Sequence, residues 1–116
     1  MLGFGGTVVN AVTPQIELIG KVAIDGDRRD ASRNPKRLED GSMTDQFGGL
    51  SGIEYTGIGN RFLLLADRGA GDGIVNYPCR YHEADLVLDP SAGTIAFELK
   101  TTQMLSTLTG EPLVGS

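Results

Sequence analysis

The stretch from Ala66 to Gly73, ADRGAGDG, carries the residue types and spacing that best suit a binding site. Asp67 and Arg68 stand where an apolar run meets a glycine-rich loop, and loops beside a rigid sheet are where ligand sites concentrate. A carboxylate binds calcium through oxygen, and a guanidinium forms two parallel hydrogen bonds to phosphate. We therefore predict Asp67 and Arg68 as substrate-binding residues, and Asp67 and Asp72 as candidate metal ligands. The alternative is an Asp67–Arg68 turn that bonds to its own backbone or to a neighbouring sheet.

The sequence around Ser51, FGGLSGIEY, resembles a glycine-flanked turn that presents a nucleophilic serine. A G-x-S-x-G turn needs glycine on both sides, and Ile53 occupies the second of these places. The chain has one histidine, His82, as a candidate base, and the residues after Ser51 lack the helical period that such a turn requires. We predict that the glycines let the chain enter a strand, that Ser51 bonds locally, and that His82 is a strand residue with a hydrogen bond.

A second acidic stretch, DGDRRD from Asp25 to Asp30, has some features of a calcium loop. It lacks the glycine of the sixth position, Lys36 stands where the bidentate glutamate is needed, and two arginines would repel a cation. We predict a solvated loop here. The alternative is that its basic residues attract an anionic substrate.

Composition and charge exclude several classes of function. The net charge is −5, which makes nucleic acid an unsuitable partner because binding it needs a basic face. The single Cys79 excludes an internal disulfide, and the single His82 excludes a two-histidine metal site. No apolar run approaches the ~20 residues that span a bilayer. No export signal is visible, so a periplasmic or extracellular location is expected only if a longer parent protein carries one.

The elements that must position these residues are strands and turns, in an all-β chain. Residues 1–14 are expected to be loose, and residues 25–46 to form a long polar loop. Alternating apolar residues predict a strand over Ile16–Ile24 and further strands over residues 50–55, 61–68, 81–89 and 94–100. The last four form an antiparallel meander over about residues 48–100. Both of its faces carry apolar residues, so it should be covered on both sides, as a propeller blade is.

The order of these motifs resembles the phytase-like domain, also called the esterase-like activity of phytase family. The residues that carry the resemblance are FGGLSGIEYTGIGNRFLLLADRG, then RYHEADLVLD, then TTQMLSTLTGEPLVG. The resemblance implies that residues 15–116 are the N-terminal part of a β-propeller, with one four-stranded blade and an extra N-terminal strand.

The resemblance also implies an activity. The chain would be a fragment of a phosphoric-ester hydrolase, with a phosphorylated small molecule as its substrate and calcium as a candidate cofactor. Whether the fragment acts as an enzyme is left open, and alone it is expected to be inactive. The alternative is a non-catalytic propeller that binds a ligand or a protein. Its expected partners are the remaining blades, or other copies of the chain through exposed blade faces.

Overall fold

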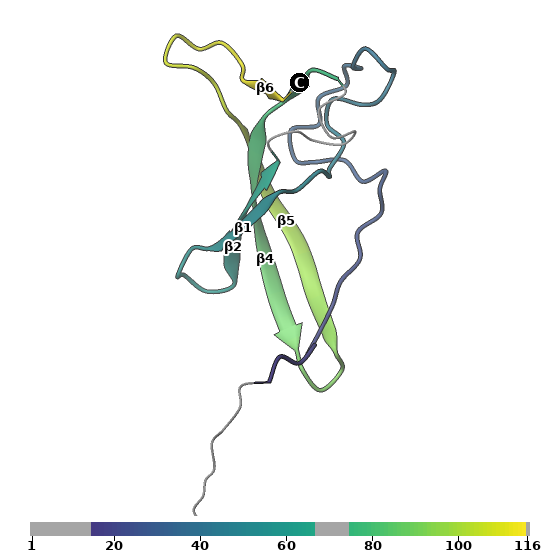
Figure 1. Cartoon of the computed structure of the whole chain (residues 1–116), viewed down its shortest axis with the longest axis vertical. Helices are drawn as coiled ribbons and strands as arrows, with labels where there is room; N and C mark the ends of the chain where they lie inside the picture. Colours follow the sequence, from purple (N-terminus) through teal and green to yellow (C-terminus); the bar gives the residue numbers. More distant parts are fainter. Residues whose placement is uncertain (1–14, 67–74, 116) are drawn as a thin grey trace, which may run out of the picture.

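The computed structural model describes residues 15–66 and 75–115, and within them the chain is all-β with no helix. Four strands form one antiparallel sheet in the order β1-β2-β4-β5, and two short strands form a second sheet (Figure 1). The strands of the main sheet are β1 (Gly52–Tyr55), β2 (Arg61–Ala66), β4 (Arg80–Asp89) and β5 (Thr94–Met104). The second sheet pairs β3 (Tyr77–Pro78) with β6 (Val114–Gly115). The predicted four-stranded meander is confirmed. The sheet is open, with β1 and β5 as its edges.

Two tight turns set the register of the meander. Gly57 and Gly59 take left-handed φ angles of 83° and 55° between β1 and β2, which glycine adopts without strain. The Asp89 carboxylate accepts hydrogen bonds from Ser91 and from the Ala92 amide at the turn between β4 and β5. Such Asx turns are the reason that aspartate and glycine mark turns in sequence.

The two faces of the sheet have different surroundings. Residues directly opposite each other in an antiparallel pair share a face, so the pairing of Leu64 with His82 and of Ala84 with Leu99 defines an inner face. Residues 24–47, here called the strap, cover this face. Phe47 packs with Leu64 and Ala84, and its ring lies 5.7 Å from the ring of Phe97. The opposite, outer face includes Arg61, Leu65, Tyr81, Glu83 and Asp85.

The predicted strand over Ile16–Ile24 is wrong. The segment makes a single bridge, in which Lys21 pairs in parallel with Thr94 at the start of β5. Ile16 is fully exposed and Leu18 is 79% exposed. Alternating apolar residues gain burial only when a neighbouring strand or layer lies against them, and no described residue provides one for the residues before Gly20.

Two further expectations need correction. The apolar run of β2 was expected to be buried on both sides, but Leu64 is buried while Leu65 on the outer face is 38% exposed. The polar loop over residues 25–46 was expected to be solvated, but Asp30 and Asp45 within it are completely buried. Both differences arise because the strap folds back over the inner face of the sheet, while among the described residues Leu65 on the outer face stays partly exposed.

Candidate functional site

Four ionisable side chains are completely buried where the strap crosses the inner face, and they form the main polar cluster of the described residues. They are Asp30 and Asp45 from the strap and Arg80 and His82 from β4. Arg80 and His82 are two residues apart, so the alternation of a strand places both on the covered face. Isolated buried charges are strongly unfavourable, so the contacts within this cluster determine what it can do.

Arg80 is held by an ion pair and by an aromatic ring. Its Nη1 donates to Asp30 Oδ2 at 2.5 Å, and its Nε donates to the carbonyl oxygen of Pro78 at 3.0 Å. The guanidinium carbon lies 3.9 Å from the centre of the Tyr77 ring, in cation–π geometry. The other oxygen of Asp30 accepts hydrogen bonds from the amide and the hydroxyl of Ser32. The pair therefore connects β4 to the strap across 50 residues of sequence.

Asp45 forms a second ion pair at the other end of the strap. Its Oδ2 accepts from both Nε and Nη2 of Arg29 at 2.6 Å, and the Asp30 amide donates to its backbone oxygen at 2.7 Å. Tyr77 donates its hydroxyl to the carbonyl oxygen of Gln46 at 2.6 Å. Burial raises the pKa of Tyr77 to about 12, because the phenolate would lose its hydration. The two ends of the strap are thus tied both to each other and to the sheet.

His82 is a buried, neutral histidine. Its Nδ1 is 2.8 Å from Thr102 Oγ1 on β5, and its ring centre lies 4.7 Å from that of Phe47. Burial lowers the pKa of His82 to about 4; Asp30 opposes this shift and Arg80 adds to it. At neutral pH the ring is therefore uncharged and far from the pKa that suits a general acid or base.

Three buried atoms in this cluster have no hydrogen-bond partner in the part of the chain that the structure describes. They are Asp45 Oδ1, Arg80 Nη2 and His82 Nε2. Buried polar atoms without partners are uncommon in native proteins. Every charged member of the cluster already has an ionic partner. The cluster therefore holds the strap against the sheet.

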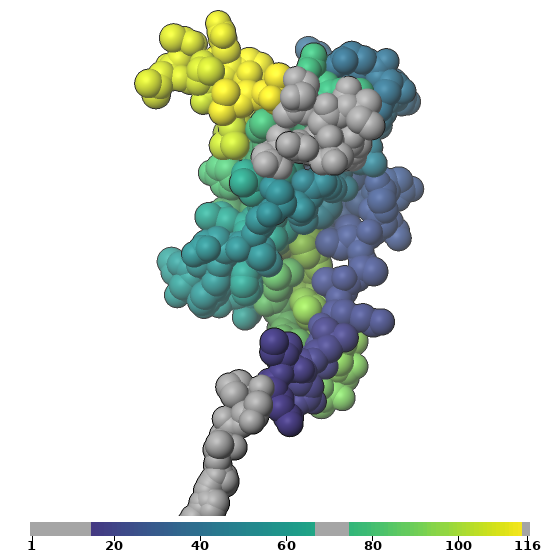
Figure 2. Space-filling model, in the orientation of Figure 1, coloured from purple at the N-terminus to yellow at the C-terminus, as the bar shows by residue number. Residues whose placement is uncertain are grey.

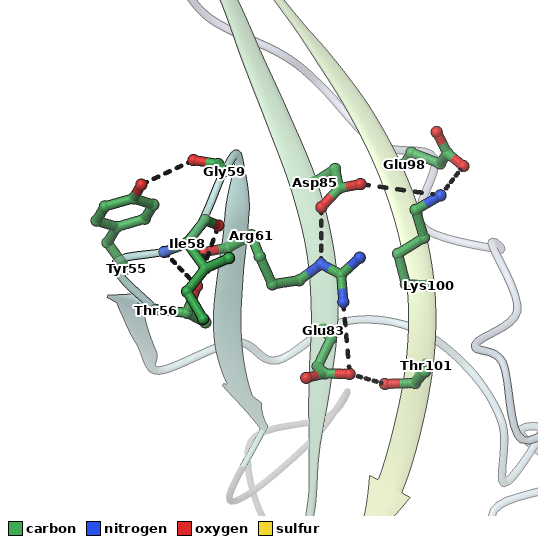
Figure 3. Close-up of polar contacts among 10 residues, drawn as sticks. All are labelled: Tyr55, Thr56, Ile58, Gly59, Arg61, Glu83, Asp85, Glu98, Lys100 and Thr101. Carbon is green, nitrogen blue, oxygen red and sulfur yellow. Dashed lines mark hydrogen bonds and ion pairs between the residues drawn. The ribbon is translucent and has the colours of Figure 1, made fainter.

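A second group of charges lies on the outer face and is partly exposed (Figure 3). Arg61 Nε donates to Asp85 Oδ1 at 2.7 Å, and Lys100 Nζ lies 3.8 Å from Asp85 Oδ2. Lys100 also pairs with Glu98, and Thr101 donates to Glu83 at 3.0 Å. The hydrogen bond from Arg61 lowers the pKa of Asp85. This half of the outer face is therefore an ion-pair network.

The predicted binding residues Asp67, Arg68 and Asp72 lie outside the described residues. β2 ends at Ala66, which is paired with Arg80. The structure therefore describes Ala66, which precedes Asp67 in sequence, and the predicted site stays a prediction.

Ser51 and His82 each bond to a different partner, so the structure does not pair them as nucleophile and base. Its amide donates to the carbonyl oxygen of Leu65 at 2.8 Å, and its hydroxyl lies 3.5 Å from the same oxygen. His82 bonds to Thr102 instead. The hydrogen bond predicted for His82 is confirmed. The local bonding predicted for Ser51 is wrong, because its amide and hydroxyl face Leu65 on the neighbouring strand, 14 residues away in sequence. Asp25 and Asp27 are exposed, and no trio of histidine, cysteine or acidic side chains in the described ranges could hold a metal ion.

Sequence reasoning missed the buried roles of Asp30, Asp45 and Arg80. The sequence did indicate that Arg80 could be buried, because the alternation in RYHEADLVLD places it on the same strand face as His82 and Ala84. No such signal marks Asp30 and Asp45, since the acids and bases around them alternate as in a solvated loop.

Comparisons with protein families, with curated proteins and with solved structures find no match to this chain. Among residues 15–66 and 75–115 there is also no helix of the length and apolarity needed to cross a membrane.

Proposed function

We propose that this chain forms one blade of a phytase-like β-propeller that hydrolyses phosphoric esters. The observation that carries the proposal is the sheet itself, which has four antiparallel strands in chain order and an outer face that the described residues leave partly exposed around Leu65. Propellers place four-stranded sheets of this kind side by side around an axis. The uncovered half of the outer face, around Leu65, is where a neighbouring sheet would pack.

Asp67 and Arg68 are the proposed contacts to substrate. They follow β2 at the end of the sheet where Arg80 begins β4. The guanidinium of Arg68 suits a phosphate group because it can donate two parallel hydrogen bonds. The buried ion pair of Arg80 with Asp30 would keep the strand ends beside this loop rigid, and a rigid support is what positions a binding loop.

Calcium has no fitting donor set among the described residues. Asp30 and Asp45 are buried, and each carboxylate faces an arginine that would repel the ion. The calcium part of the proposal therefore rests on Asp67 and Asp72 alone, and no catalytic step is derived from it.

Release of phosphate from phytate and from p-nitrophenyl phosphate, with added calcium and with a chelator, tests the proposal. The chain and any longer protein that contains it are both assayed. Turnover is expected to be lost in Asp67→Ala and in Arg68→Ala, and to be kept in the exposed-loop controls Asp27→Ala and Lys36→Ala. Unchanged turnover in Asp67→Ala and Arg68→Ala would refute their assignment as substrate contacts, but it would leave the hydrolase class standing. No turnover of either ester by a folded longer protein that contains this chain would refute the hydrolase class, because the chain alone is expected to be inactive.

The second candidate is a blade that binds a phosphorylated small molecule without reacting. The observation that favours it is that His82, the one histidine, is buried with its pKa lowered to about 4. Binding of phytate measured by calorimetry, with no phosphate released over hours, would select this candidate over hydrolysis.

A further inference from the structure

The β1 edge of the sheet is open, whereas the β5 edge is partly occupied. Lys21 bridges to Thr94 at one end of β5, and the Ala31 amide donates to Thr102 Oγ1 near the other end. Within the described residues, β1 pairs with β2 and with no other strand. The edge at which another strand can add is therefore β1 (Figure 1).

The direction of the backbone groups along β1 follows from its pairing with β2. The Thr56 amide donates to the carbonyl oxygen of Arg61 at 3.1 Å, which makes these two residues a hydrogen-bonded pair. Such pairs alternate along an antiparallel ladder. The next ones are Glu54 with Leu63 and Gly52 with Leu65. The amide and carbonyl groups of Ile53 and Tyr55 therefore point away from β2 and are free to pair.

On the inner face, the side chains along this edge are apolar and exposed. Ile53 is 59% exposed and Tyr55 is 49% exposed, both on the inner face beyond the strap. On the outer face, Gly52 contributes no side chain, and a shallow hollow of about 340 Å³ lies beside it, lined in part by Leu63, Leu65 and Tyr81. An edge with free backbone groups and apolar side chains favours pairing with another strand.

We propose that β1 pairs antiparallel with β1 of a second copy of this chain, with Ile53 directly opposite the same residue of the other copy. Several registers satisfy the direction of the backbone groups, and those centred on Ile53 and on Glu54 pair the largest part of β1, Gly52–Tyr55. The second would place two carboxylates directly opposite each other, which is destabilising. The first places Glu54 opposite Gly52 of the other copy, above the hollow that this glycine leaves.

We assign the strand that pairs with β1 to a second copy of this chain, because β1 is complementary to itself in this register. A two-fold interface needs only one self-complementary patch, and the pairing of Ile53 with itself and of Glu54 with Gly52 supplies it. The pairing joins two four-stranded sheets edge to edge. It leaves the faces free, so it does not depend on the proposed function.

Sedimentation equilibrium of the purified chain tests the pairing. The chain is expected to be a dimer, and Ile53→Lys is expected to raise its dissociation constant at least tenfold. Ile58→Lys is the matched control, because Ile58 is 75% exposed in the adjoining turn but lies off the strand. A monomeric chain, or a dimer that Ile53→Lys leaves intact, would overturn the proposal.

Cysteine cross-linking tests the register and remains decisive if Ile53→Lys fails to fold. The background variant Cys79→Ser removes the natural thiol. Ile53→Cys should then form a disulfide-linked dimer on oxidation, because the paired Cα atoms would be about 5.5 Å apart. Glu54→Cys should not, since a two-residue offset separates its Cα atoms by about 8 Å. Cross-linking at position 54 and not at 53 would refute the register.

Discussion

The buried pair of Arg80 and Asp30 offers the sharpest test of how the strap is held. Arg80→Met keeps much of the side-chain volume but removes the guanidinium that donates to Asp30 Oδ2 at 2.5 Å. Both side chains are completely buried, so the aspartate would be left as an uncompensated buried charge. Removing one partner of such a pair costs about 3–5 kcal/mol of unfolding free energy. A folded domain has about 5–15 kcal/mol in total, so the variant should be close to unfolding.

Two companion variants separate the charge from the packing. Asp30→Asn keeps an oxygen that can accept from Ser32 but leaves Arg80 without its counter-ion. The double variant Asp30→Asn with Arg80→Met removes both charges, and it should cost less than the sum of the two single changes. A coupling free energy of at least 1 kcal/mol is expected for groups in direct contact. Arg61→Met is the matched control, because it breaks a partly exposed ion pair whose contribution water screens.

Urea unfolding followed by circular dichroism gives these free energies, and hydrogen exchange locates the effect. The Phe47 amide donates to the carbonyl oxygen of Arg28 at 2.7 Å, so its exchange rate reports whether the strap is closed. Arg80→Met should accelerate this exchange more than that of β2 amides. An unfolding free energy within about 1 kcal/mol of the parent chain, together with unchanged exchange at Phe47, would refute the assignment of the pair as the strap's fastener.

Three further predictions concern His82 and the aromatic side chains of Tyr77 and Phe47, which contact Arg80 and His82. The pKa of His82 is about 4 in the folded chain against 6.5 when unfolded, so the unfolded chain binds the proton first; stability should fall by about 3 kcal/mol as pH drops from 6.5 to 4, and His82→Gln should flatten that slope in urea melts. The pKa of Tyr77 is about 12 against 10, so its contribution to stability is lost as pH rises through this range. An ultraviolet titration should show an ionisation step near pH 12, and Tyr77→Phe should remove that step. Phe47→Ala should cost about 3–5 kcal/mol, because Phe47 is only 4% exposed and packs on Leu64 and Ala84; a thermal melt within a few degrees of the parent would contradict this.

The sequence by itself determined the meander. Alternating apolar residues were enough to predict β1, β2, β4 and β5 in order. Each hairpin joins residues that are close in sequence, so its register is decided by turn chemistry and by the two-residue period of a strand. The same reasoning failed for Ile16–Ile24, where the period was present but a neighbouring strand was not.

Only the tertiary structure decided which charges are buried. Asp30 and Asp45 read as members of a solvated loop, and they became buried because the strap returns across the inner face to meet Arg80. The burial of a charge depends on a counter-ion that is distant in the chain, here 50 residues away. The residues next to an aspartate in sequence do not indicate whether such a distant partner exists. The two-residue period of a strand, in contrast, can be recognised from the residues of the strand alone.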